Sequence, residues 1–111
     1  GRSLGMPRCA VVMPVRGPFQ EARSVDVYDG AYTCRFVRAE SIDAASVAAV
    51  DELRNDARFK SFRSGSLDGS PRIEIDQVRS AGWFEGRRGV PGYIFYDESS
   101  CDEAKRAARR R

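Results

Sequence analysis

Residues 88–111, RGVPGYIFYDESSCDEAKRAARRR, contain a basic loop, an aromatic strand and a basic helix in that order. In the strand, Tyr93 and Phe95 share one face, while Ile94 and Tyr96 share the other. A sheet that is covered on one side only needs one polar face, and this strand has none. We therefore expect its second apolar face either to be covered by another segment or to bind a partner.

The helix that follows the aromatic strand carries its charges in a definite order. Ser99 or Ser100 is the expected N-cap, and Asp102 and Glu103 occupy the first turn, where the helix dipole favours carboxylates. The basic residues that follow in this helix are Lys105, Arg106 and Arg109. This order suits the dipole whether or not the cations bind a ligand, so it also has a purely structural explanation.

The middle of the chain predicts a helix and a strand. Ser41 is the expected N-cap of the helix. The apolar residues that recur at helical spacing are Val47, Val50, Leu53 and Ala57. We expect Phe59 and Phe62 to close the core just after this helix. Residues 72–78 alternate between apolar and polar side chains, which predicts a half-buried strand with Ile75 on its buried face.

A local turn signal predicts a hairpin earlier in the chain. Asp29 and Gly30 stand between two alternating runs, residues 24–28 and 31–37, and an Asp-Gly pair is typical of a two-residue hairpin turn. The side chains expected on one face of the second strand are Tyr32, Cys34 and Phe36. The hairpin opens the element order strand, strand, helix, strand, strand, helix.

This order indicates one α+β domain over residues 24–111. Residues 1–23 are then an N-terminal extension, in which the apolar run 9–15 predicts a further strand. Because proline cannot donate to a sheet ladder, Pro14 either places that strand at an edge or ends it.

The composition disfavours several classes of protein. The chain has 111 residues, a net charge of +3, and arginine at nearly all of its basic positions. It has three widely spaced cysteines and no histidine, so a structural zinc site and a Ser-His-Asp triad both lack essential residues. No phosphate-binding glycine loop and no membrane-spanning apolar run is present. We expect a non-enzymatic intracellular protein, nuclear or cytoplasmic, without a cofactor or metal.

Residues 88–96 resemble the third-strand signature of the RNA recognition motif, K/R-G-F/Y-G/A-F-V-x-F/Y. Residues 88–89 match its start and residues 92–96 its end, while Val-Pro at 90–91 replaces a single aromatic residue. The resemblance implies a ferredoxin-like domain, with a mostly antiparallel sheet on two helices and the aromatic strand in the middle of the sheet. The family's C-terminal fourth strand is missing, and residues 24–28 are the candidate to fill its position.

The aromatic strand and the resemblance together imply non-catalytic binding of single-stranded RNA or DNA. Bases would stack on sheet aromatics, since every base has a π-face and each stack is worth ~1–3 kcal/mol. Basic side chains would contact the phosphates. The expected stacking residues are Tyr93 and Phe95, helped by Tyr32 or Phe36. The expected phosphate contacts are Arg87, Arg88, Lys105, Arg106 and Arg109.

The same element order also suits a ubiquitin-like β-grasp domain, whose partner would be another protein. A hairpin, a helix and two further strands would complete that fold by Tyr96. Strand pairing separates the two interpretations. A β-grasp pairs its first and last strands in parallel, whereas an RNA recognition motif contains only antiparallel pairs.

Overall fold

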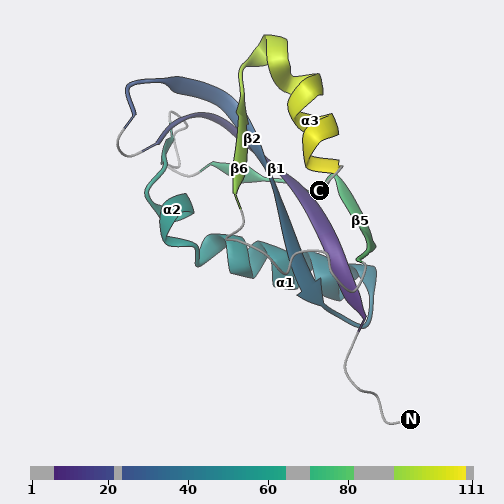
Figure 1. The fold of residues 1–111 in the computed structure, drawn as a ribbon. Helices are drawn as coiled ribbons and strands as arrows, with labels where there is room; N and C mark the ends of the chain where they lie inside the picture. The colour runs from purple at the N-terminus through teal and green to yellow at the C-terminus, as the bar shows by residue number, and fades with distance from the viewer. Residues whose placement is uncertain (1–6, 22–23, 65–70, 82–91, 110–111) are drawn as a thin grey trace, which may run out of the picture.

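The computed structural model describes residues 7–21, 24–64, 71–81 and 92–109 (Figure 1). The fold is α+β, with helices packed on an antiparallel sheet, which confirms the predicted fold class and is compatible with a ferredoxin-like fold. The strands are β1 (Arg8–Gln20), β2 (Val27–Arg38), β3 (Arg63–Ser64), β4 (Arg72–Ile73), β5 (Gln77–Ser80) and β6 (Tyr93–Tyr96). The helices are α1 (Ile42–Arg54), α2 (Ala57–Lys60), the 3₁₀ helix η1 (Glu98–Ser100) and α3 (Cys101–Arg109).

The sheet is built on one long hairpin. β1 and β2 pair from Arg8 opposite Arg38 onward, with a shift in register between Arg16 and Phe19. β3, β4 and β5 pair with the other side of β1, and β6 pairs with β2. Every pair among the described strands is antiparallel, so the parallel pair of a β-grasp does not occur among them. β1 is therefore central, and the aromatic strand β6, expected in the middle, lies at an edge of the described sheet.

The two faces of the sheet form two separate cores. One contains Val11, Met13, Val15 and Phe19 of β1 with Ala45, Ala49 and Leu53 of α1. The other contains Ala10 and Val12 of β1 and Tyr32, Cys34 and Tyr96, with Ala104 and Ala108 of α3. Alternation along β1 thus directs one set of side chains to α1 and the other to α3. Because the helices cover opposite faces, both apolar faces of β6 are packed against a core.

α1 begins where the sequence predicts. The Ser41 hydroxyl accepts a hydrogen bond from the N–H of Ala44 at 3.0 Å, which satisfies one free donor of the first turn. The buried stripe differs from the prediction and consists of Ala45, Ala49 and Leu53. Leu53 of the predicted stripe is buried, but Val47 is 62% exposed, because at about 3.6 residues per turn it lies on the other side of the helix from Ala45 and Ala49. Phe59 and Phe62 are buried beside this core, as predicted.

The last helical segment is capped by Asp97 and not by Ser99 or Ser100. The Asp97 carboxylate accepts a hydrogen bond from the N–H of Ser100 at 3.0 Å, and the Ser100 hydroxyl accepts one from the N–H of Asp97 at 3.1 Å. This reciprocal pair starts the 3₁₀ turn η1, which leads directly into α3.

The predicted turn at Asp29 and Gly30 is wrong, because both residues lie inside β2. A Cβ atom at Gly30 would collide with the Tyr96 phenol ring and would lie 2.8 Å from the carbonyl oxygen of Val15. The glycine is therefore required by the close packing of Tyr96 over the strand, and no turn is involved. From the sequence alone, an Asp-Gly pair that forms a hairpin turn cannot be distinguished from one whose glycine makes room for a distant side chain.

The prediction of an edge strand at residues 9–15 is also wrong, because these residues belong to the first half of β1, which is central in the sheet. Pro14 is tolerated because the neighbouring ladder is interrupted beside it. β4 pairs with residues 15–16 and β5 with residues 9–12. Between them, the N–H of Glu74 donates to the carbonyl oxygen of Pro14 at 2.9 Å. The N–H and C=O of one residue point to the same side of a strand, so the missing donor faces this irregular segment.

Two further strands predicted from the sequence differ in the structure. Residues 72–78 do not form one strand, because the chain leaves the ladder at 74–76 and Ile75 is exposed. The hairpin is instead formed by β1, which ends at Gln20, and β2, which begins at Val27. Only the end of segment 24–28 belongs to a strand, and that strand is β2, so the segment does not fill a fourth-strand position.

Candidate functional site

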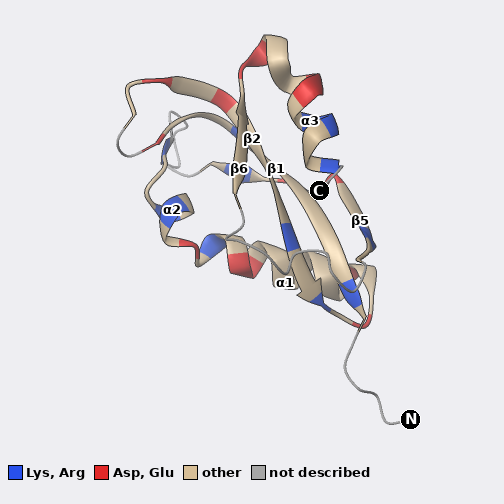
Figure 2. Ribbon diagram, viewed as in Figure 1, with Lys and Arg blue, Asp and Glu red and all other residues tan. Residues whose placement is uncertain are grey.

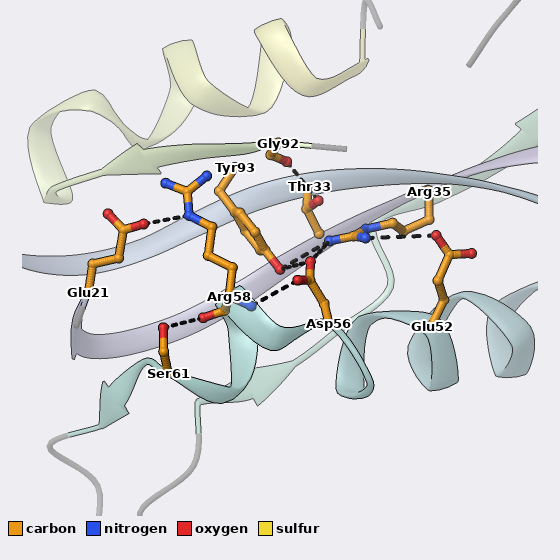
Figure 3. Close-up of polar contacts among 9 residues, drawn as sticks. All are labelled: Glu21, Thr33, Arg35, Glu52, Asp56, Arg58, Ser61, Gly92 and Tyr93. Atoms are coloured by element: carbon orange, nitrogen blue, oxygen red, sulfur yellow. Dashed lines mark hydrogen bonds and ion pairs between the residues drawn. The ribbon is translucent and has the colours of Figure 1, made fainter. Parts of the chain in front are cut away.

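Arg35 is the centre of a buried polar network between the sheet and the start of α2 (Figure 3). Its side chain is only 4% exposed. Its Nη2 donates to Asp56 Oδ2 at 2.9 Å and to the Tyr93 hydroxyl at 3.0 Å. The Tyr93 hydroxyl donates to the same Asp56 oxygen at 2.8 Å, and Glu52 lies 3.7 Å from Arg35 Nη1. These contacts join β2, β6 and the α1–α2 connection.

The contacts within the network shift the pKa values of Asp56 and Tyr93. Burial opposes ionisation of Asp56, but the hydrogen bonds from Arg35 and Tyr93 outweigh it, and the pKa of Asp56 is lowered. Burial and the hydrogen bond to Asp56 raise the pKa of Tyr93. At neutral pH the network therefore holds a carboxylate, a guanidinium and a neutral phenol. Because these groups are directed at one another and Arg35 and Tyr93 are buried, the network stabilises packing and does not offer them to a ligand.

The expected aromatic platform at Tyr93 and Phe95 is covered by the chain itself. Tyr93 is 9% exposed, and Phe95 is partly buried against the same core. The Arg58 guanidinium lies 5.1 Å from the Tyr93 ring centroid and 5.3 Å from that of Phe95, and Glu21 binds Arg58 in turn. The Tyr28 ring stacks on Phe95 with centroids 4.7 Å apart. Tyr93 is therefore buried and does not face solvent as predicted, and the Phe95 ring is partly covered by Arg58 of the same chain and by neighbouring rings.

Tyr32 is also unavailable for stacking, because it lies in the core beneath α3. Its residue exposure is 5%, and its ring centroid is 5.5 Å from that of Tyr96. Burial, together with the nearby Cys101 thiol, raises the pKa of Tyr32 to about 12. We conclude that Tyr32 packs α3 against the sheet.

Phe36 is the remaining aromatic residue predicted to stack on a base, and it lies near the end of β2, away from the other three. It is half-buried, and it lies opposite Ala10, which in turn lies opposite Arg79 of β5. Directly opposed residues share a face, so Phe36 and Arg79 flank the small Ala10 side chain on the α3 face of the sheet. In the next row, Arg8 lies opposite Arg38. The Arg8 guanidinium is 5.8 Å from the Phe36 ring centroid.

These four residues, Arg8, Phe36, Arg38 and Arg79, are called the Phe36 surface below. They place three cations and one aromatic residue on the same face of the sheet, at the end where β1 begins and β2 ends. Figure 2 shows basic residues at the start of β1, on β5 and in the last turns of α3.

The predicted cations of α3 separate into two groups. Arg109 donates to both carboxylate oxygens of Asp76, at 2.8 and 3.0 Å, immediately before β5. Lys105 lies one turn earlier on the same side of α3. Arg106 instead lines a groove beside β6. Predicted contacts Arg87 and Arg88 lie outside the described residues.

Arg8, Arg38 and Arg79 are not among the contact residues predicted from the sequence. A partial signal is present, because Phe36 and Arg38 alternate along β2 and therefore share a face. Phe36 and Arg38 share a face with Arg79 only because of the register of β1, β2 and β5. No local pattern specifies that register, so these arginines could not be grouped from the sequence.

Comparison of the chain with known protein families, curated proteins and solved structures finds no match. Within the described ranges, no group of three or more Cys, Asp or Glu side chains is placed to hold a metal ion. None of the helices that the structure describes is long and apolar enough to cross a membrane.

Proposed function

We propose that this chain is a non-catalytic module that binds single-stranded nucleic acid on the Phe36 surface. One observation carries the proposal: the register of β1, β2 and β5 places Arg8, Arg38 and Arg79 on the same face of the sheet as the half-buried Phe36, and the Arg8 guanidinium lies 5.8 Å from the Phe36 ring centroid. The net charge of +3 also favours a polyanionic partner. The proposal retains the stacking chemistry expected from the sequence and assigns it to Phe36 in place of Tyr93 and Phe95.

The chemistry of this surface suits an unpaired nucleotide. A base can stack on Phe36, and arginine can both contact phosphate in a bidentate manner and stack on a base. Because adjacent strands are ~4.8 Å apart, the backbones of Phe36 and Arg79 are ~10 Å apart across β1. The ring and the cations can therefore contact the base and the backbone of one bound strand. Bases in a duplex are already stacked on their neighbours, which favours a single-stranded ligand.

Titration with labelled pools of single-stranded RNA and DNA at low salt tests the proposal. Phe36→Ala removes one stack, so we expect affinity to fall about 5- to 150-fold. Arg54→Gln is the matched control, because Arg54 is an exposed cation at the end of α1, on the opposite face of the sheet. Its affinity should equal that of the parent chain. Absence of binding by the parent chain at low salt would overturn the proposal.

A further inference from the structure

β6 has one side without a partner strand among the described residues, because its only described pairing is with β2. Every second residue of an edge strand directs its N–H and C=O groups outward. Natural edge strands often carry charges or proline that prevent pairing with another chain. β6, Tyr93-Ile94-Phe95-Tyr96, has neither. Its outer side can therefore accept a further strand.

An open groove of about 520 Å³ lies between β6 and α3. Ile94, Ala104 and Ala107 contribute to the apolar part of its lining, while the polar part includes Glu103 and Arg106, one negative and one positive charge. These two charged residues are three positions apart on α3, so they are neighbours on the helix surface. Neither forms an ion pair within the described part of the chain.

We propose that two copies of this chain associate through the β6 edge and this groove as a symmetric dimer. In a two-fold interface, every contact from one residue to another is repeated in the opposite sense. Two β6 strands can then pair antiparallel and extend the sheet across the axis. Glu103 of each copy faces Arg106 of the other, so the ion pair forms twice.

Charge complementarity is the reason to assign a second copy as the occupant. A patch with one acid and one base on adjacent turns is complementary to itself across a two-fold axis. A nucleic acid, which has charge of one sign only, would meet repulsion from Glu103. The apolar lining from Ile94, Ala104 and Ala107 would be removed from water in both copies at once.

The pairing is tested by reversing the charge of Glu103 or of Arg106. Dimerisation of each variant is measured by sedimentation equilibrium over a wide range of protein concentration. Glu103→Arg places like charges opposite each other at both contacts, and so does Arg106→Glu. Each variant alone should dimerise about tenfold or more weakly than the parent chain. An equal mixture of the two variants restores both attractive contacts, so it should form a heterodimer of near-parental affinity.

Matched controls are Asp102→Arg and Lys105→Glu, which make the same changes of charge at the same spacing but outside the groove lining. Asp102→Arg also places the same charge in the first turn of α3, so it reproduces any cost to the helix. These controls should dimerise like the parent chain. The proposal is overturned if the parent chain stays monomeric at the highest concentration, if either groove variant dimerises normally, or if the mixture shows no recovery.

Discussion

Replacement of Asp56 by alanine removes the carboxylate that Arg35 and Tyr93 share. Removing one partner of a buried ion pair costs ~3–5 kcal/mol. Here the Asp56 side chain is 21% exposed, and Glu52 still lies 3.7 Å from Arg35, so we expect the electrostatic part to be ~2–3 kcal/mol. Asp56 also caps α2 by accepting a hydrogen bond from the N–H of Arg58 at 2.9 Å, a contact worth ~1 kcal/mol. The expected total loss of stability is therefore ~3–4 kcal/mol.

Urea denaturation followed by circular dichroism measures this loss as a change in the free energy of unfolding. Asp56→Asn separates the two contributions, because asparagine retains a capping oxygen but loses the charge, and it should cost only ~2–3 kcal/mol. Glu52→Gln is the control, since this more exposed and more distant carboxylate should contribute less than ~1 kcal/mol. A loss below ~1 kcal/mol for Asp56→Ala would refute the view that the buried Arg35 depends on Asp56.

Three other predictions follow from the same packing. Because the pKa of Asp56 is lowered in the folded chain, its stabilising effect is complete above its ordinary value of 3.8 and is lost as pH falls below that value through the lowered pKa. Stability measured against pH should show this loss, and Asp56→Asn should remove that part of the dependence. Gly30→Ala should destabilise the fold by ~1–3 kcal/mol in urea denaturation, because its Cβ would collide with the Tyr96 ring; an unchanged midpoint would disprove that contact. Leu53→Ala should cost ~2–5 kcal/mol and Val47→Ala less than ~0.5 kcal/mol, since only Leu53 is buried; similar costs for the two variants in thermal melts would contradict the exposure of Val47.

The elements that depend on local chemistry are the ones that the sequence predicted well. Ser41 caps α1, and the aromatic run around Ile94 forms β6, as expected. The segment that follows β6 is helical, although its cap is Asp97. Each of these features is specified within a few residues by capping, alternation or charge order, so no tertiary information is needed to find it.

The features that depend on distant contacts were not predictable in this way. Gly30 is explained by Tyr96, and Pro14 by a break in the ladder at Glu74. The burial of Tyr93 follows from its contacts with Arg35 and Asp56, which are 58 and 37 positions away in the sequence. A single sequence contains no signal that pairs such residues, and for this reason the burial of Tyr93 could not be predicted from the sequence.

The salt dependence of single-stranded nucleic-acid binding tests the role of the Phe36 surface most directly. On single strands, each phosphate contact contributes ~0.7 to the slope of log affinity against log salt concentration. The double variant Arg8→Gln/Arg38→Gln should therefore bind more weakly and lower the magnitude of the slope by ~1.4, while Arg54→Gln should leave it unchanged. A slope that is equal in all three proteins, or no binding by the parent chain at the lowest salt concentration, would contradict a nucleic-acid site at this surface.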